Sequence, residues 1–277
     1  MNFQHYYTQQ SFMSDPGRYQ HYFADLPDDP AFLCEWIRGL MLHFLDHENI
    51  SEKRLAELNI RRVEDMFEQI LHLNNEALTI PRMTENKLIG CCRDFSLLLC
   101  AVLRHKKIPA RLRFGFTTFH LPNFHHDQVL LEYWHEDKQA WCFADVRMNE
   151  RYIKKHQLDS QITSHDIPRE WFFTAGQAWQ LCRTGAKNPL QFGSGVERRY
   201  SGWNFIRNKM IQDLAALNLV EVLPWDCWGV MLQSIDDFAL LDDLAALITD
   251  EKINVAEINQ FFRSTEIFVP VHILPAC

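Results

Sequence analysis

The sequence predicts an α+β fold: a buried central helix packed on an antiparallel sheet, with a helical C-terminal extension. Three observations support this class. Residues 92–105 are apolar nearly all round, which is typical of a helix buried on every side. Residues 110–119, 127–135 and 141–145 alternate in character with the period of two expected of strands. The chain after Asp145 has mostly helical spacing of its apolar residues.

The segments before the central helix predict an arm, two helices and a loop. Residues 1–28 lack periodicity and are expected to form a surface arm. Asp29-Pro30 is expected to begin a helix, because proline suits the first helical position, and apolar residues from Phe32 to Phe44 follow at steps of three and four. A second helix is expected over 62–73 and a loop over 75–90.

Turn residues separate the three predicted strands. Lys106 to Pro109 ends the central helix, Pro122-Asn123 forms a turn, and Glu136 to Lys138 forms a polar hairpin tip. Apolar spacing then predicts four helices, over 171–181, 204–217, 236–248 and 255–262. We expect three parts: an arm over 1–28, a core over 29–150, and a mostly helical part over 151–277 packed on the core.

The composition excludes several classes of protein. With 20 Phe, 8 Trp and 7 Tyr, the 277 residues carry too much apolar area for a disordered chain. The net charge is 28 minus 36, or −8, so no basic face for a nucleic-acid partner is expected. The longest apolar run, Ser96 to Leu103, falls far short of the about 18 to 20 residues that span a membrane.

The N-terminal residues and the cysteines indicate a cytoplasmic protein. Residues 1–20 lack the basic and apolar regions of a signal peptide. The 8 cysteines are too few for a disulfide scaffold. We expect most of them to be buried thiols in a reducing compartment.

The segment with the most chemical information is Gly90-Cys91-Cys92-Arg93-Asp94-Phe95-Ser96. A glycine before a buried helix allows a tight turn and places a cysteine in the first helical turn. The backbone N–H groups and the helix dipole there stabilise an anion, so a thiol at that position has a lowered pKa. The thiolate is the nucleophilic form, and the same N–H groups can hold an oxyanion. The alternative is that both cysteines only fill a contact between helix and sheet.

This segment and the blocks that follow it resemble the core of the transglutaminase-like superfamily, which has a papain-like cysteine fold. The resemblance covers residues 88–149. Its later blocks are Ile108-Pro109-Ala110-Arg111, Phe114-Gly115-Phe116, Glu132-Tyr133-Trp134 and Trp141 through Asp145. A weaker resemblance, over Leu223 to Gly229, is to uncharacterised bacterial members.

The resemblance implies roles for individual residues. Cys92 corresponds to the nucleophile on the central helix, and Cys91 to a variable, structural position. Asp145 corresponds to the acid that orients the catalytic base, with an ordinary turn residue at a strand end as the alternative. The family histidine stands four residues before the strand glutamate, so Glu132 points to position 128, which is Gln128. A glutamine cannot accept the thiol proton.

Two possibilities therefore stay open for the base. His126 shares a strand face with Gln128 but lies about 6.5 to 7 Å further along the strand. A bulge or a shifted register would be needed to bring it to Cys92. His125 faces the other way, and a solvated loop is the alternative for both histidines. The second possibility is that the site has a weakened base, or binds without turnover.

No metal or cofactor is expected. His120, His125, His126 and Asp127 suggest a metal site, but their spacing matches no common zinc pattern. The chain also contains no glycine-rich phosphate cradle.

The sequence therefore favours two hypotheses. In the first, the protein is a thiol acyl-transfer enzyme, an amidase, peptidase or transamidase acting on a protein, peptide or small amide. Cys92 attacks the carbonyl, His126 or a histidine outside the motif moves the proton, and Asp145 orients that base. Backbone N–H groups near Cys92, with the Gln128 amide, hold the oxyanion. In the second, Gln128 marks a fold that has lost turnover and serves as a binding or scaffold protein. A metal-binding regulator is a distant third hypothesis, and the acceptor and oligomeric state stay open.

Overall fold

The computed structural model describes residues 3–47, 49–159, 161–195, 200–235, 237–249, 253–264, 267–270 and 273. These residues form helices and a mixed sheet, which confirms the predicted α+β class. The chain divides into two compact units: unit 1 comprises Met1–Tyr6, Leu112–Val129 and Pro168–Cys277, and unit 2 comprises Tyr7–Arg111 and Leu130–Ile167. These boundaries differ from the expected parts, because two long strands each run from one unit into the other.

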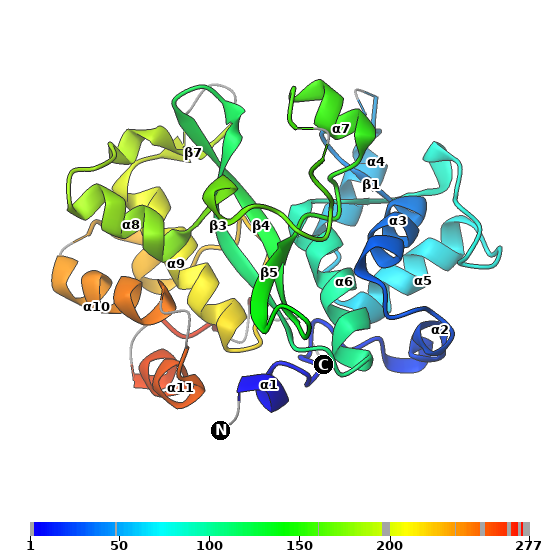
Figure 1. The fold of residues 1–277 in the computed structure, drawn as a ribbon, viewed down its shortest axis with the longest axis horizontal. Helices are drawn as coiled ribbons and strands as arrows, with labels where there is room; N and C mark the ends of the chain where they lie inside the picture. The colour runs from blue at the N-terminus through cyan, green and yellow to red at the C-terminus, as the bar shows by residue number, and fades with distance from the viewer. Residues whose placement is uncertain are drawn as a thin grey trace. The chain divides into compact units, whose positions relative to one another are not determined.

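Unit 2 contains three main helices. α3 (Pro30–Leu40) begins as predicted, with Asp29 as its N-cap: the Asp29 Oδ1 accepts a hydrogen bond from the Ala31 N–H at 3.0 Å. α5 (Val63–Leu73) matches the second predicted helix. Both pack against α6 (Cys92–His105), as Figure 1 shows in blue and cyan. The shorter helices of the unit include α4 (Glu52–Leu55) and α7 (Glu150–Lys155).

The central helix α6 is buried as predicted. Every residue from Arg93 to Arg104 is buried, both arginines included. Arg104 donates to the Ala110 carbonyl at 2.9 Å and to the Ser14 hydroxyl at 3.0 Å. These bonds offset part of the cost of removing a guanidinium from water.

A short parallel sheet precedes α6. β1 (Met41–His43) pairs with β2 (Leu88–Gly90), with His43 in register with Gly90. The apolar pattern from Phe32 to Phe44 therefore belongs to a helix and then a strand, and part of the expected loop over 75–90 is a strand. Three residues are too few for a period of two to be recognised.

Residues 7–28 pack into unit 2, in contrast to the expected surface arm. Tyr7, Met13 and Phe23 are buried. The Phe23 ring, on α2 (His21–Ala24), lies 5.6 Å from the Phe67 ring of α5. The described helices here, α1 (Phe3–Tyr6) of unit 1 and α2, are four residues long, which is too short to produce a helical repeat.

The strands of unit 1 follow the order β6-β3-β4-β7-β8 in the described residues. β3 (Ala110–Leu121) pairs antiparallel with β6 (Phe172–Thr174), and β4 (Phe124–His135) pairs in parallel with β7 (Phe192–Ser194). β7 pairs antiparallel with β8 (Tyr200–Ser201). A Cβ on Gly115 would lie 2.2 Å from the Phe173 carbonyl oxygen, so glycine is what lets β6 approach β3. In unit 2, β4 pairs antiparallel with β5 (Ala140–Ala144), as the predicted hairpin requires.

The two arginines of β3 are buried, although the alternating pattern alone would place them on a polar face. In unit 2, Arg111 donates to Glu132 at 2.7 Å. In unit 1, Arg113 donates to Asp213 at 2.9 Å. Each charge is compensated by an acid that is distant in sequence. Because the arginines are paired in this way, the strand face that carries them can be buried as well.

The longer helices in the described part of unit 1 are α8 (Ala175–Arg183), α9 (Trp203–Leu217), α10 (Phe238–Thr249) and α11 (Val255–Ser264). α8, α9 and α10 pack on one another (Figure 1), and α11 contacts α9. The predicted helix over 171–181 begins later, at Ala175, because Phe172–Thr174 pair as β6. Thr174 is the N-cap of α8, and its hydroxyl accepts from the Gln177 N–H at 3.3 Å.

Candidate functional site

The candidate site is the N-terminus of α6 in unit 2. β2 leads into it directly, with Cys91 as the N-cap residue in an extended conformation and Cys92 as the first helical residue. The Cys91 N–H donates to the Asp94 carboxylate at 2.8 Å, which closes the first turn. Cys91 is only 2% exposed, whereas Cys92 is partly exposed. Of the two thiols, Cys92 is the one that a reagent can reach.

Most other described thiols are poor nucleophiles. Burial raises the pKa of Cys91 well above its ordinary value, and its hydrogen bond with Cys92 adds to the effect. Burial also raises the pKa of Cys34 and of Cys182 to about 12. Such thiols carry almost no thiolate at neutral pH. Cys227 is an exposed thiol in the described part of the chain, although burial raises its pKa as well.

Asp145 follows β5 and is buried. Its backbone N–H donates to the Ser164 carbonyl at 2.8 Å, and its Oδ1 accepts from the Arg147 N–H at 3.0 Å. The Arg147 guanidinium carbon lies 5.3 Å from the centre of the Tyr152 ring, and its Nη2 lies 3.4 Å from Asp46 Oδ1. The carboxylate of Asp145 therefore shapes the turn that carries Arg147.

Cys92 and Asp145 act electrostatically on the same two side chains. Burial opposes the charge of Arg147, but Tyr152, Asp145, Asp46 and Cys92 together raise its pKa. Burial raises the pKa of Tyr152, and the charges of Asp145 and Cys92 raise it further. Charges act strongly on one another only over short distances. The charges of Cys92 and Asp145 therefore both bear on the pKa values of Arg147 and Tyr152.

Gln128 and His126 belong to unit 1. Gln128 is buried on β4. The Nδ1 of His126 lies 3.4 Å from Asp127 Oδ1, and its Nε2 accepts from the Gly195 N–H at 3.4 Å. His125 and His126 pair with consecutive residues of β7, so the described ladder has no bulge between them. The ladder therefore does not show the bulge that would displace His126 along its strand. Its role as the base stays a prediction.

His125 is a strand residue, so the solvated-loop alternative for this pair is wrong. Its ring lies 5.3 Å from the Phe173 ring and 4.6 Å from the Phe192 ring. Neither ring nitrogen has a hydrogen-bond partner among the described residues. Burial, helped by the nearby charge of Lys187, lowers the pKa of His125 to about 4. The side chain is a neutral part of an aromatic core.

The sequence analysis missed His43, the histidine that the β1–β2 register places beside Gly90. It is buried, and its ring lies 6.2 Å from the Phe95 ring of α6. The Leu45 N–H donates to its Nδ1 at 3.2 Å. A neutral ring that accepts at Nδ1 carries its proton on Nε2. The three-residue strand β1 offered no sequence signal for the placement of His43. The only sequence signal for Arg147 was its position two residues after Asp145.

No group of three or more His, Cys, Asp or Glu side chains is placed to hold a metal ion among the described residues. His120, His125, His126 and Asp127, the group considered from the sequence, do not form such a cluster. His120 instead shares a 2.5 Å hydrogen bond with the Thr117 hydroxyl.

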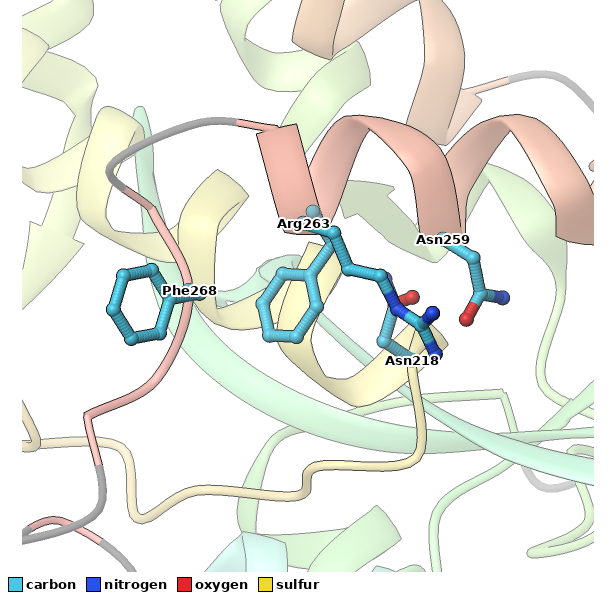
Figure 2. Close-up of a pocket in the computed structure, with 5 residues that line it drawn as sticks. Asn218, Asn259, Arg263 and Phe268 are labelled. Atoms are coloured by element: carbon cyan, nitrogen blue, oxygen red, sulfur yellow. The ribbon is translucent and has the colours of Figure 1, made fainter.

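Each unit contains an open cavity in its described residues. In unit 2, about 250 Å³ opens beside β1 and β2. Its lining residues are Leu42, His47, Asn49, Ile50, Ser51, Arg54, Thr84, Glu85 and Ile89. In unit 1, about 440 Å³ is lined by Asn218, Asn259, Phe262, Arg263 and Phe268. Figure 2 shows Asn218, Asn259 and Arg263 grouped together, with the Phe268 ring to one side. The lining of this second cavity contains no nucleophile.

Among the described helices, none combines the length and the apolar character needed to cross a bilayer.

Comparison with known proteins gives one family and one distant structure. Residues 72–146, which include Cys92, Gln128 and Asp145, match the model of the transglutaminase-like superfamily. No curated protein matches the chain. A solved protein from Cytophaga hutchinsonii, described as a proposed cysteine protease, is similar at 16% sequence identity and a TM-score of 0.34. The match covers 53% of this chain and 42% of that one, less than half of the solved protein's length.

Proposed function

We propose that this chain, whose residues 72–146 match the model of the transglutaminase-like superfamily, transfers acyl groups through a covalent thioester on Cys92. The Cys92 thiolate attacks the carbonyl carbon of an amide, peptide or ester and releases the leaving group. Water then resolves the acyl-enzyme in a hydrolase, and an amine does so in a transamidase. The substrate is a protein, a peptide or a small amide in the cytoplasm.

The position of Cys92 is the observation that carries this proposal. It is the partly exposed first residue of a 14-residue helix, whereas the adjacent Cys91 is buried. The N-terminal N–H groups of α6 stabilise both a thiolate and the oxyanion that forms after attack. Asp145, in the same unit, is buried, and its Oδ1 accepts a hydrogen bond from the Arg147 N–H at 3.0 Å.

The chain departs from the family in the group that accepts the thiol proton. By the resemblance, Gln128 occupies the position of the family histidine, and its amide can donate to an oxyanion but cannot act as a base. His126 would need a displaced strand, and the ladder with β7 is regular at this residue. By the resemblance, the proposal therefore assigns Gln128 to oxyanion stabilisation and not to the role of base.

Selective alkylation tests the nucleophile. At pH 6, iodoacetamide is expected to label one thiol much faster than all others, and the modified peptide is expected to contain Cys92. Cys227→Ser provides the background in which the other accessible described thiol is removed. Cys92→Ala is expected to abolish the fast phase. Uniformly slow labelling of all thiols would contradict a catalytic role for Cys92.

Gln128 specifically favours the second candidate, a binding or scaffold protein that has lost turnover. Under that alternative the wild-type chain hydrolyses no member of a generic panel of amides and esters. Gln128→His would then restore hydrolysis, because it supplies the missing base. Activity of the wild-type chain that Cys92→Ala removes would reject the alternative.

A further inference from the structure

Strand β2, which leads into the helix of the candidate nucleophile, is held by a buried ion pair of unit 2. The Ile89 N–H donates to Glu57 Oε2 at 2.8 Å, and Glu57 is buried. Glu57 pairs with Arg54, and the guanidinium of Arg54 also donates to the Lys87 carbonyl. Hydrogen bonds that involve a charged group are stronger than neutral ones. The backbone from 87 to 89 is therefore tied to the ion pair at two points.

The turn that begins at Asp145 is held by a second cation, from α3. Within the turn, the Met148 N–H donates to the Asp145 carbonyl at 3.0 Å. Arg38 Nη1 donates to the Val146 carbonyl at 2.8 Å and to the Met148 carbonyl at 3.2 Å. A guanidinium presents several donors in a rigid fork, so one arginine can hold two carbonyls at once. Arg38 therefore fixes the turn against α3.

Lys87 joins these two sets of hydrogen bonds. Its carbonyl accepts from Arg54, and its Nζ donates to the Arg38 carbonyl at 2.6 Å. Its ammonium forms no ion pair within the part of the chain that the structure describes. Burial lowers the pKa of Lys87, and the charge of Arg38 lowers it further. The cation is therefore costly at this position, where it connects β2 to α3.

The two segments that these cations hold have little regular structure of their own. β2 has three residues and pairs with a strand of three residues. The backbone after β5 enters the turn without joining a helix until Glu150. So short a ladder and so short a turn leave the position of each segment to its hydrogen bonds with neighbouring side chains.

We propose that Lys87 and Arg38 are positioning residues, which hold the strand before Cys92 and the turn of Asp145 in one fixed relation during acyl transfer. This inference rests on the proposed roles of Cys92 and Asp145. Neither cation is assigned a contact with the substrate. A displacement of about 1 Å in a reacting group can slow a reaction about 100-fold, so the relation of the two segments controls the rate.

The first experiment compares turnover with alkylation in the full chain. Lys87→Met removes the ammonium and keeps an unbranched stem. Turnover of 4-nitrophenyl acetate is expected to fall about tenfold. Iodoacetamide labelling of Cys92 at pH 6 is expected to stay within about threefold of wild type, because alkylation requires a thiolate but no oriented base and no oxyanion site. Lys87→Arg, which keeps the charge and the donor, is expected to recover at least about half of the turnover.

Two outcomes of this experiment would overturn the inference. Turnover of Lys87→Met equal to that of wild type would show that the tie does not affect the reaction. An equal loss of turnover and of Cys92 labelling would assign Lys87 to stability alone.

Arg82→Met is the matched control. Arg82 is a buried arginine of unit 2 that donates to the Ala77, Ile80 and Glu76 carbonyls, at 2.6 to 2.7 Å, and holds neither β2 nor the turn. The melting temperature is expected to fall at least as far as in Lys87→Met, while turnover stays within about twofold of wild type. A tenfold loss of turnover in Arg82→Met would show that any loosened loop slows the reaction, and would overturn the specific role of Lys87.

Hydrogen exchange tests the connection without a reaction. Lys87→Met is expected to speed exchange of the amides of residues 89–91 and of residues 145–148 at least about fivefold, because both segments lose part of their restraint. Arg82→Met is expected to change neither. A change confined to residues 89–91 would contradict the shared role.

The outcomes separate this inference from the proposed function. Absence of both turnover and selective labelling in the wild-type chain overturns the proposed function, and faster exchange in both segments would then still support the tie between them. Unchanged exchange and turnover in Lys87→Met overturn the inference and leave the nucleophile in place.

Discussion

The buried ion pair of unit 1 gives a prediction whose size follows from its geometry. Asp213 of α9 is fully buried and accepts hydrogen bonds from Arg113 Nη2 at 2.9 Å and from the Phe114 N–H at 2.7 Å. Asp213→Asn keeps the shape but removes the charge, so the Arg113 guanidinium is left buried without its anion. Breaking one side of a buried pair costs about 3–5 kcal/mol.

Differential scanning calorimetry of the full chain tests this value. The transition of unit 1 is expected to fall by about 10 to 20 °C in Asp213→Asn. The matched control is Asp242→Asn, which changes an exposed pair with Arg183 at 2.8 Å in the same unit. That pair is expected to contribute at most about 1 kcal/mol.

An apolar replacement of both partners provides the second test. Arg113→Leu combined with Asp213→Leu is expected to be more stable than Asp213→Asn, because it leaves no uncompensated charge. If Asp213→Asn melts within about 3 °C of Asp242→Asn, the reasoning about burial is refuted.

Three further predictions concern single side chains. His125, with a pKa lowered to about 4, binds its proton less tightly when folded, so the free energy of unfolding falls by up to about 1.4 kcal/mol per unit as pH drops from about 6.5 to 4. His125→Phe should flatten melting temperature against pH, and an unchanged slope would contradict this. Cys91→Ser places a favoured N-cap residue before α6, so the melting temperature should hold or rise and iodoacetamide should still label Cys92; loss of labelling would move the nucleophile to Cys91. Arg111→Lys loses the guanidinium that donates to Glu132 and lies 4.0 Å from the Trp141 ring, at an expected cost of about 2 kcal/mol; an unchanged urea midpoint would refute that value.

Several elements were predictable because their signals are local. The buried helix over 92–105 was expected at its observed bounds, since one continuous apolar run encodes it. The N-cap Asp29 and the hairpin of β4 and β5 depend on residues close together in the chain. The thiol at the start of α6 was predictable for the same reason, because glycine, cysteine and helix are adjacent.

Other elements had no local signal. β1, β2, β6 and β7 are three residues long, and each is defined by a partner far away in sequence. The packing of residues 7–28 into unit 2 depends on isolated aromatic contacts such as that between Phe23 and Phe67. Such contacts are specified by surfaces that exist only after folding.

The amino-acid order alone determined the α+β class, the central helix and the candidate nucleophile, because helix periodicity and capping operate within a few residues. Only the tertiary structure decided which charges are compensated. Arg111 meets an acid 21 positions away, Arg113 one 100 positions away, and Arg147 one 101 positions away. Burial and Coulomb interactions depend on distance in space, which a linear pattern does not encode.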